Sequence, residues 1–258
     1  MKNNKRSYGI AMAILGISIL ACNLGTGSTP SDTLAPDGSS VPSSNSNSAS
    51  ACFNSLLPIK AGATWAYKIT GPAPDTFTRT VLAVDASGFT DQDVFGSGVT
   101  RQSQWKCENG NLIALNPGNG NSSSVNAENI SANFQTTESS GVTIPATMNA
   151  GDTWTQSITL EGTQTINGEE VPVKNQTSST CTAIGNESVT VEAGTFDAMR
   201  FDCQTSMNIV MTMQGTEIPV SLNLNSSNWH AENIGLIKTV ATGEGLDSII
   251  ELVSYIIP

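Results

Sequence analysis

Few residues in this chain have types and spacings that suit catalysis or metal binding. The chain has one histidine, His230, and it lacks the serine-nucleophile, zinc-helix and phosphate-loop motifs. Asp91 and Asp93 lie in an expected loop before Gly96 and Gly98 and could contribute to a calcium site, but the glutamate that completes such a loop is missing. We therefore predict a structural His230, no enzymatic activity, and no metal or cofactor.

Four cysteines, Cys52, Cys107, Cys181 and Cys203, suit disulfide chemistry better than metal binding. Thiol metal sites need closely spaced cysteines with partner histidines, and this sequence has neither. Among the three possible connectivities we favour Cys52–Cys107 with Cys181–Cys203, because each pair closes a loop within one half of the chain. Each bridge would contribute roughly 3–4 kcal/mol by restricting the unfolded chain.

The fifth cysteine, Cys22, follows a segment typical of export. Basic residues at positions 2, 5 and 6 precede the apolar run Tyr8–Leu20, which is short and interrupted by Gly and Ser. The junction Ile19-Leu20-Ala21-Cys22 resembles the lipobox of bacterial lipoproteins, in which the cysteine is acylated and becomes the mature N-terminus. The resemblance implies a signal peptide over residues 1–21 and a lipid anchor, such as palmitate, on Cys22. The alternative is a plain secretory signal with an incidental cysteine.

The segment after the anchor has the composition of a linker. Of the 29 residues from 23 to 51, 21 are Ser, Thr, Asn, Gly or Pro, so this segment cannot build a core. A flexible coil of this length reaches roughly 30 Å. We therefore predict that residues 22–51 tether a folded domain, residues 52–258, to the extracytoplasmic side of a bacterial envelope membrane.

The charge of the chain argues against two classes of partner. Three of its eleven basic residues lie in the signal, which leaves eight against 22 acidic residues and a mature net charge of −14. An acidic surface repels nucleic acid and anionic lipid headgroups. We therefore predict no nucleic-acid partner and attachment to the membrane through Cys22 alone, with an envelope protein as a further candidate partner.

Residues 52–258 have the pattern of an all-β domain. Trp65, Tyr67 and Ile69 alternate with polar residues, as in a strand with one buried face. Asn109-Gly110 is a strong hairpin signal, and Gly194 supplies the positive φ for a second hairpin over residues 189–200. With Ala193-Gly194 as the turn, that hairpin would pair Glu187 with Arg200 on its outer end.

Two sequence echoes suggest an internal duplication. Ala61-Gly-Ala-Thr-Trp65 resembles Ala150-Gly-Asp-Thr-Trp154, and residues 104–113 resemble residues 228–237 in the same order. These echoes predict two repeated halves, residues 56–120 and 144–242. The alternative is a chance recurrence of turn residues in an all-β chain.

One predicted hairpin has a broad apolar face that could bind a ligand. Its apolar residues alternate with polar ones on both sides of Gly215 and share one side of the hairpin. Either this face packs the core, or it lines an adaptable pocket, because methionine fills irregular space. The predicted ligand-binding residues are Met207, Ile209, Met211, Met213, Ile218, Val220, Leu222 and Leu224.

Three segments together resemble a group of uncharacterised bacterial envelope proteins. They are Val191–Arg200, Trp229–Lys238 and Glu251–Tyr255, and the likeness extends mainly over residues 144–255. That group is related to the lipoprotein-localisation carriers and lipid-binding lipoproteins of the LolA, LolB and LppX type. The resemblance implies a strongly curved, half-barrel-like antiparallel sheet with an apolar concave side that receives acyl chains. It implies no catalytic residue.

Two functions are consistent with these observations. In the first, a membrane-tethered envelope lipoprotein binds a lipid or another apolar ligand in the concave sheet. In the second, a structural or protein-interaction lipoprotein fills the same face with its own core and presents strand edges or its acidic surface to a partner. An unfilled apolar groove along residues 207–224 would distinguish the first from the second.

Overall fold

The structure, a computed structural model, describes residues 52–115, 124–127, 130–166, 168–243 and 246–258. The described residues form thirteen β-strands and no helix. They are β1 (Thr64–Thr70), β2 (Asp75–Val84), β3 (Gly88–Phe95), β4 (Thr100–Glu108), β5 (Asn111–Ala114), β6 (Ser124–Ala127), β7 (Ile130–Gly141), β8 (Thr153–Ile166), β9 (Glu169–Val191), β10 (Gly194–Met213), β11 (Thr216–Ala231), β12 (Gly235–Thr242) and β13 (Ser248–Ile256).

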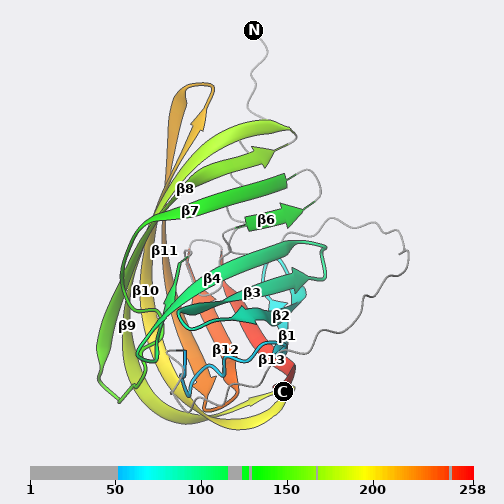
Figure 1. The fold of residues 1–258 in the computed structure, drawn as a ribbon, viewed down its shortest axis with the longest axis vertical. Helices are drawn as coiled ribbons and strands as arrows, with labels where there is room; N and C mark the ends of the chain where they lie inside the picture. The colour runs from blue at the N-terminus through cyan, green and yellow to red at the C-terminus, as the bar shows by residue number, and fades with distance from the viewer. Residues whose placement is uncertain (1–51, 116–123, 128–129, 167, 244–245) are drawn as a thin grey trace, which may run out of the picture.

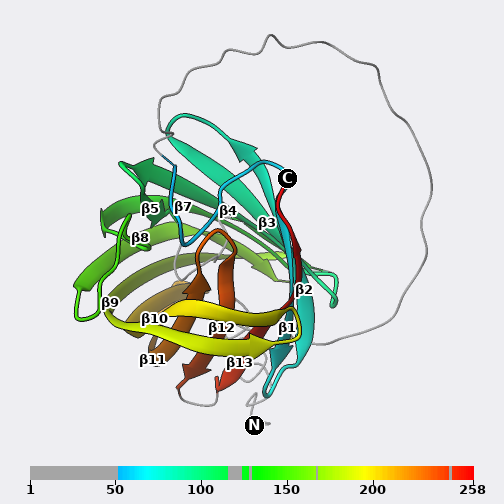
Figure 2. The ribbon, with the colours of Figure 1, turned by 90° about the horizontal axis from the view of Figure 1, so that it is seen from below.

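The strands form one antiparallel sheet that curves until its two ends meet (Figure 1). Most neighbours in the sheet are also neighbours in the chain, but β1 pairs with β13, and β4 pairs with both β3 and β6. Twelve strands thus surround a common interior, as Figure 2 shows, and β5 lies beside β4. The β4–β6 contact is short, with Thr100–Gln102 opposite Ser124–Asn126. The predicted all-β, strongly curved antiparallel fold is confirmed.

Alternation of apolar and polar residues decides which side of each strand faces the interior. In β1, Trp65, Tyr67 and Ile69 are all buried and face inward, as the sequence predicted. In β3 the inward positions are Phe89, Asp91, Asp93 and Phe95, so two of its four buried side chains are charged.

Strands β8 to β11 are the longest, and the far end of the β10–β11 hairpin projects beyond the rest of the sheet in Figure 1. The buried apolar side chains of the protein form two separate clusters. The larger one contains the aromatic residues of β1 to β4 and both disulfides. The smaller one, at the far ends of β9 and β10, is formed by Val171, Val173, Ile209 and Met211.

The segment before β1 packs against one end of the larger core. Asn54 donates from Nδ2 to the carbonyl oxygens of Gly110, at 2.8 Å, and Pro145, at 3.0 Å. The Cys52–Cys107 disulfide joins this segment to β4, and Cys181–Cys203 joins β9 to β10. Both predicted disulfide pairings are therefore present.

Two local predictions are wrong. The hairpin over residues 189–200 turns at Glu192-Ala193, so Gly194, with a φ of 138°, is opposite Val191, and Arg200 is opposite Gly185. The backbone amide of Ala193, in this turn, donates to the Leu252 carbonyl of β13, and the sequence of the turn alone could not predict this long-range contact. The expected loop around Asp91 and Asp93 is also wrong, because both residues lie inside β3.

Other predictions lie outside the described residues or stay untested. The signal over residues 1–21, the lipid attachment at Cys22 and the linker are all in the first group. The internal duplication stays a prediction, because consecutive antiparallel neighbours occur in any sheet of this kind. In the part of the chain that the structure describes, no helix is long and apolar enough to cross a membrane.

Candidate functional site

A cavity of about 200 Å³ lies inside the closed sheet. One part of its wall is aromatic, with Trp65, Tyr67 and Phe77 from β1 and β2. Another part is polar and includes Ser179 from β9 and Asn228 from β11. The cavity thus offers both apolar surface and hydrogen-bonding groups to a molecule small enough to enter it.

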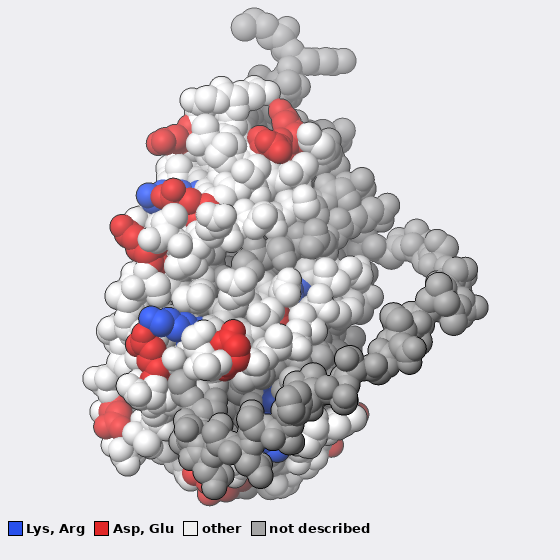
Figure 3. All heavy atoms as spheres, viewed as in Figure 1, with Lys and Arg blue, Asp and Glu red and all other residues white. Residues whose placement is uncertain are grey.

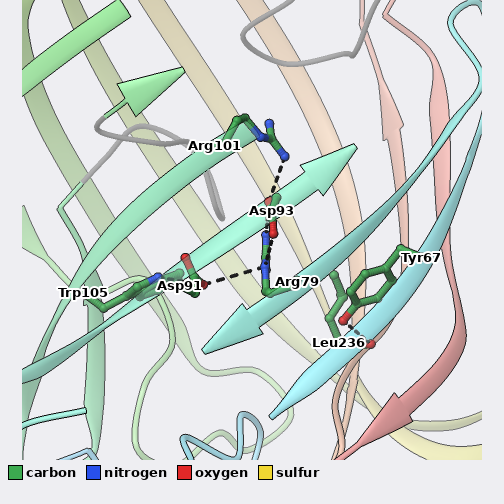
Figure 4. Close-up of polar contacts among 7 residues, drawn as sticks. All are labelled: Tyr67, Arg79, Asp91, Asp93, Arg101, Trp105 and Leu236. Atoms are coloured by element: carbon green, nitrogen blue, oxygen red, sulfur yellow. Dashed lines mark hydrogen bonds and ion pairs between the residues drawn. The ribbon is translucent and has the colours of Figure 1, made fainter. Parts of the chain in front are cut away.

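Two arginines from β2 and β4, each with 12% of its side chain exposed, also line this cavity and share one carboxylate (Figure 4). Arg79 donates from Nε and Nη2 to the two oxygens of Asp93, at 2.8 and 2.9 Å. Arg101 donates from Nη2 to Oδ2 of the same residue at 3.0 Å. A second carboxylate, Asp91, lies 3.7 Å from Nε of Arg79 and accepts a hydrogen bond from Nε1 of Trp105 at 3.2 Å. We call Arg79, Asp91, Asp93 and Arg101 the ion cluster.

Strand register brings the ion cluster together. Arg79 of β2 is opposite Asp93 of β3, and Asp93 is opposite Arg101 of β4, so the three residues form one row across three neighbouring strands. Sequence reasoning missed the cluster because it placed Asp91 and Asp93 in a loop. Their spacing of two from Phe89 and from Phe95 was the available signal, since residues with that spacing share one face of a strand.

Burial and charge have opposing effects on the pKa values of the two carboxyl groups. Burial raises the pKa of Asp91 to about 6, although the charge of Arg79 opposes the change. For Asp93, burial acts in the same direction, but the charges of Arg79 and Arg101 and their hydrogen bonds outweigh it and lower the pKa. Asp93 is therefore the permanent anion of the ion cluster, whereas Asp91 can take up a proton in mildly acidic conditions.

Burial favours the neutral form of both arginines, and it lowers the pKa of Arg101. For Arg79, burial favours the neutral form, yet the charges of Asp93 and Asp91 outweigh it and raise the pKa. Burial raises the pKa of the Tyr67 hydroxyl, which donates a hydrogen bond to the Leu236 carbonyl at 3.1 Å. Tyr67 therefore stays neutral, and it adds no charge to those of the ion cluster.

His230 lies against the segment that covers one end of the sheet. Its Nδ1–H donates to the carbonyl oxygen of Leu56, with Nδ1 and the oxygen 3.0 Å apart. Burial lowers the pKa of His230 to about 4, so the ring is neutral at physiological pH. These contacts agree with the structural role that the sequence predicted, which stays a prediction.

The structure divides the predicted ligand-binding face into two parts. Met207 and Leu224 line the interior cavity. Ile209 and Met211 are buried in the smaller core cluster, and the remaining four residues pack half-buried against it: Met213, Ile218, Val220 and Leu222. The paired strands do place all eight residues on one face, but only its inner end reaches the cavity.

On the outer surface, Arg200 pairs with two acidic groups. It donates from Nε to Asp202 at 2.9 Å, lies 3.7 Å from Glu187, and its guanidinium covers the Trp229 ring at 5.3 Å. The predicted Glu187–Arg200 pair therefore forms, but diagonally across the two strands. On the face in Figure 3, red acidic groups are scattered and outnumber the blue basic ones.

The surroundings of Asp91 and Asp93 do not favour the calcium site to which the sequence suggested they could contribute. The two carboxylates face Arg79, Arg101 and Trp105, which occupy the directions from which a cation would bind. Across the described ranges, no group of three or more His, Cys, Asp or Glu residues is arranged to hold a metal ion.

Comparisons with known proteins place most of the sheet in one sequence family. The model of a family described as DUF3108-like matches residues 90–254. No curated protein matches the chain.

Three solved structures resemble the described fold. A predicted exported protein with a YmcC-like fold from Bacteroides fragilis has 16% identity and a TM-score of 0.47, covering 80% of this chain and 100% of its own. A predicted lipoprotein from Parabacteroides distasonis has 16% identity and a TM-score of 0.48, covering 79% and 99%. The hypothetical lipoprotein YmcC from Escherichia coli has 11% identity and a TM-score of 0.35, covering 82% and 91%.

Proposed function

The chain belongs to the DUF3108-like family, and from that premise we propose that it is a lipoprotein of a bacterial cell envelope whose closed sheet binds a small apolar ligand. Cys22 holds the protein on the membrane, and residues 23–51 act as the tether. The ligand occupies the interior cavity between β1, β2, β9 and β11. Two of the similar structures belong to proteins described as lipoproteins, which supports the anchored part of the proposal.

The observation that carries the proposal is the mixed wall of the cavity. Trp65 and Phe77 are almost fully buried, yet both line space that no side chain fills. An apolar ligand placed there is stabilised mainly because its own apolar surface leaves water, at about 25 cal/mol per Å². The cavity volume of about 200 Å³ favours a short chain or a single ring over a complete membrane lipid.

A second function is favoured by the methionine residues. Ile209 and Met211 are at most 5% exposed, and four further residues of the same face pack against their cluster, so most of the face that was expected to bind lipid is filled by its own side chains. In this function the protein is a structural or protein-interaction lipoprotein, and its acidic surface contacts another envelope component. Both functions leave the protein without catalysis, in keeping with the neutral His230 and its bond to Leu56.

Native mass spectrometry of the mature chain, residues 22–258 with Cys22→Ser, separates the two functions. The substitution removes the acylation site, so any bound mass reports the folded domain. Ligand binding predicts a co-purified small molecule, or uptake of one when short fatty acids, alcohols and aromatic compounds are added. A clean mass after purification and after every addition would reject ligand binding and leave the structural function.

A further inference from the structure

A patch of uncharged polar side chains forms one part of the cavity wall. Its members come from four neighbouring strands, β9 to β12, and they are Ser179, Thr205, Ser226, Asn228 and Thr239. Four of them carry a hydroxyl and one carries an amide, so the patch both donates and accepts hydrogen bonds without any charge. We call these five residues the neutral patch.

One series of hydrogen bonds in the neutral patch ends at Ser226. The Thr239 hydroxyl donates to Oδ1 of Asn228 at 3.0 Å, and Nδ2 of Asn228 donates to Oγ of Ser226 at 3.0 Å. Ser226 accepts this bond, and its own hydroxyl donates to no residue that the structure describes. Since Ser226 lines the cavity, its hydroxyl hydrogen is available to a molecule inside.

A pair of hydroxyls lies beside Ser226 on the same wall. Ser179 of β9 is opposite Thr205 of β10, and their oxygens are 2.9 Å apart, so one hydroxyl donates to the other. This bond uses one of the two hydroxyl hydrogens and one of the lone pairs. Ser226 is opposite Cys203, two residues before Thr205, so the pair and Ser226 occupy adjacent rows of the inner face. Together they offer a ligand both donors and acceptors.

The charged side chains of the wall disfavour an ionic ligand. Arg79 and Arg101 are the charged side chains that the described residues contribute to this wall, and both already donate to Asp93. An anion beside them would come close to the carboxylates of Asp93 and Asp91, and a cation would face the guanidiniums. Either ion would also lose its water on entry, which is costly in a low-dielectric interior.

The aromatic part of the wall supplies apolar surface for the rest of the ligand. Trp65, Tyr67 and Phe77 line the same cavity, and Tyr67 and Phe77 stack with their ring centroids 4.9 Å apart. We propose that the cavity binds a small uncharged alcohol, with its hydroxyl bonded to Ser226 and its apolar part against these aromatic side chains. This inference rests on the proposed function and adds the chemical class of the ligand.

Four probes with one ring and different substituents test the inference on unaltered binding residues. Toluene, benzyl alcohol, benzoate and benzylamine are titrated at neutral pH into the mature Cys22→Ser chain by isothermal calorimetry. A site without hydrogen-bonding groups would favour toluene strongly, because burying an unpaired hydroxyl is costly. We expect benzyl alcohol to bind at least as tightly as toluene, and about ten-fold or more tightly than either ion. Tighter binding of toluene, or equal or tighter binding of either ion, would overturn the inference and leave the proposed function intact. If none of the four binds, the proposed function fails as well.

A pair of serine variants assigns the hydroxyl preference to Ser226. Ser226→Ala should weaken benzyl alcohol binding about three- to ten-fold, the effect of one neutral hydrogen bond, and leave toluene binding unchanged. Ser227→Ala is the matched control, because Ser227 is the next residue of β11 and its hydroxyl accepts a hydrogen bond from Arg200 on the outer surface at 3.3 Å. This control should bind both probes as the parent chain does. Unchanged benzyl alcohol binding in folded Ser226→Ala, or an equal loss for toluene, would refute the assignment, and if that variant does not fold, the probe series alone decides.

Discussion

Arg79 and Asp93 face each other across β2 and β3, joined by two hydrogen bonds of 2.8 and 2.9 Å inside the closed sheet. Arg200 makes the same two-bond contact with Asp202 on the outer surface, at 2.9 and 3.0 Å. The side chain of Asp93 is 2% exposed and that of Asp202 is 39% exposed. The chain thus contains a buried and an exposed form of one interaction, which allows the effect of burial to be measured.

Asp93→Asn should destabilise the protein by roughly 3–5 kcal/mol, because it removes the buried carboxylate to which Arg79 and Arg101 both donate. Asp202→Asn, the exposed control, should cost at most about 1 kcal/mol. Urea denaturation of both variants gives the two free energies of unfolding. Equal losses would show that the ion cluster is solvated and that the interior is wetter than the burial of its residues indicates.

The stability contribution of His230 should decline in mildly acidic solution. Its pKa is about 4 in the folded protein against 6.5 in the unfolded chain, so the unfolded chain binds the proton first as the pH falls. The contribution is lost progressively from pH 6.5 to 4, by roughly 2 kcal/mol between pH 7 and pH 5. His230→Asn should therefore lose less stability than the parent chain between these two pH values, as measured by denaturation at each.

Protonation of Asp91 changes the stability in the opposite direction over nearly the same pH range. The His230 variant must therefore be compared with the parent chain. Its folded pKa of about 6 lies above the usual 3.8, so the folded protein gains stability as the pH falls through this window. The parent chain shows the sum of both effects, and only the difference between variant and parent isolates His230. A variant that follows the parent at both pH values would contradict the assigned protonation state.

The two disulfides should differ in what their removal does to local structure. Cys181–Cys203 joins two strands that are already hydrogen-bonded along their length, whereas Cys52–Cys107 holds the segment before β1 against the core. Each double replacement by serine should cost roughly 3–4 kcal/mol. Hydrogen exchange should speed up at residues 52–58 only when Cys52–Cys107 is removed, and a uniform change in both variants would be evidence against this division.

Substitutions at Met211 and Met213 test whether the predicted ligand-binding face is filled by its own side chains. Met211 is 2% exposed in the smaller core cluster, and Met213 is half-buried at its margin. Met211→Ala should cost roughly 2–5 kcal/mol through the cavity that it leaves, and Met213→Ala clearly less. Thermal or urea unfolding measures both, and a small loss for Met211 would mean that this face is open enough to admit a ligand.

Cys22 should carry the membrane anchor. Cells that produce the full chain should incorporate labelled palmitate into it and retain it in the membrane fraction. Cys22→Ala should abolish both, because no other part of the mature chain is expected to bind lipid headgroups. Labelling that persists in this variant would disprove the assignment of the anchor.

Local patterns in the sequence were enough to predict several elements of the fold. The alternation around Trp65, the turn at Asn109-Gly110 and the pairing of residues 207–213 with 216–224 all occur as expected. Each depends on residues close together in the chain, where side-chain period and turn chemistry act directly. The disulfide pairing followed from a different argument, that each bridge closes a loop within one half of the chain.

The closure of the sheet and the cavity inside it depend on the pairing of strands that are far apart in the chain. The β1–β13 and β3–β4 pairs help to close the sheet on itself, and the β1–β13 pair joins strands from the two ends of the described chain. Asp91 and Asp93 looked like loop residues because they stand close to Gly96 and Gly98. They are stable inside a strand because arginines from β2 and β4 lie opposite, and no local pattern contains that information. Local alternation thus predicts several of the strands and the faces that they bury, but not β3, whereas long-range pairing creates the cavity and brings the ion cluster to its wall.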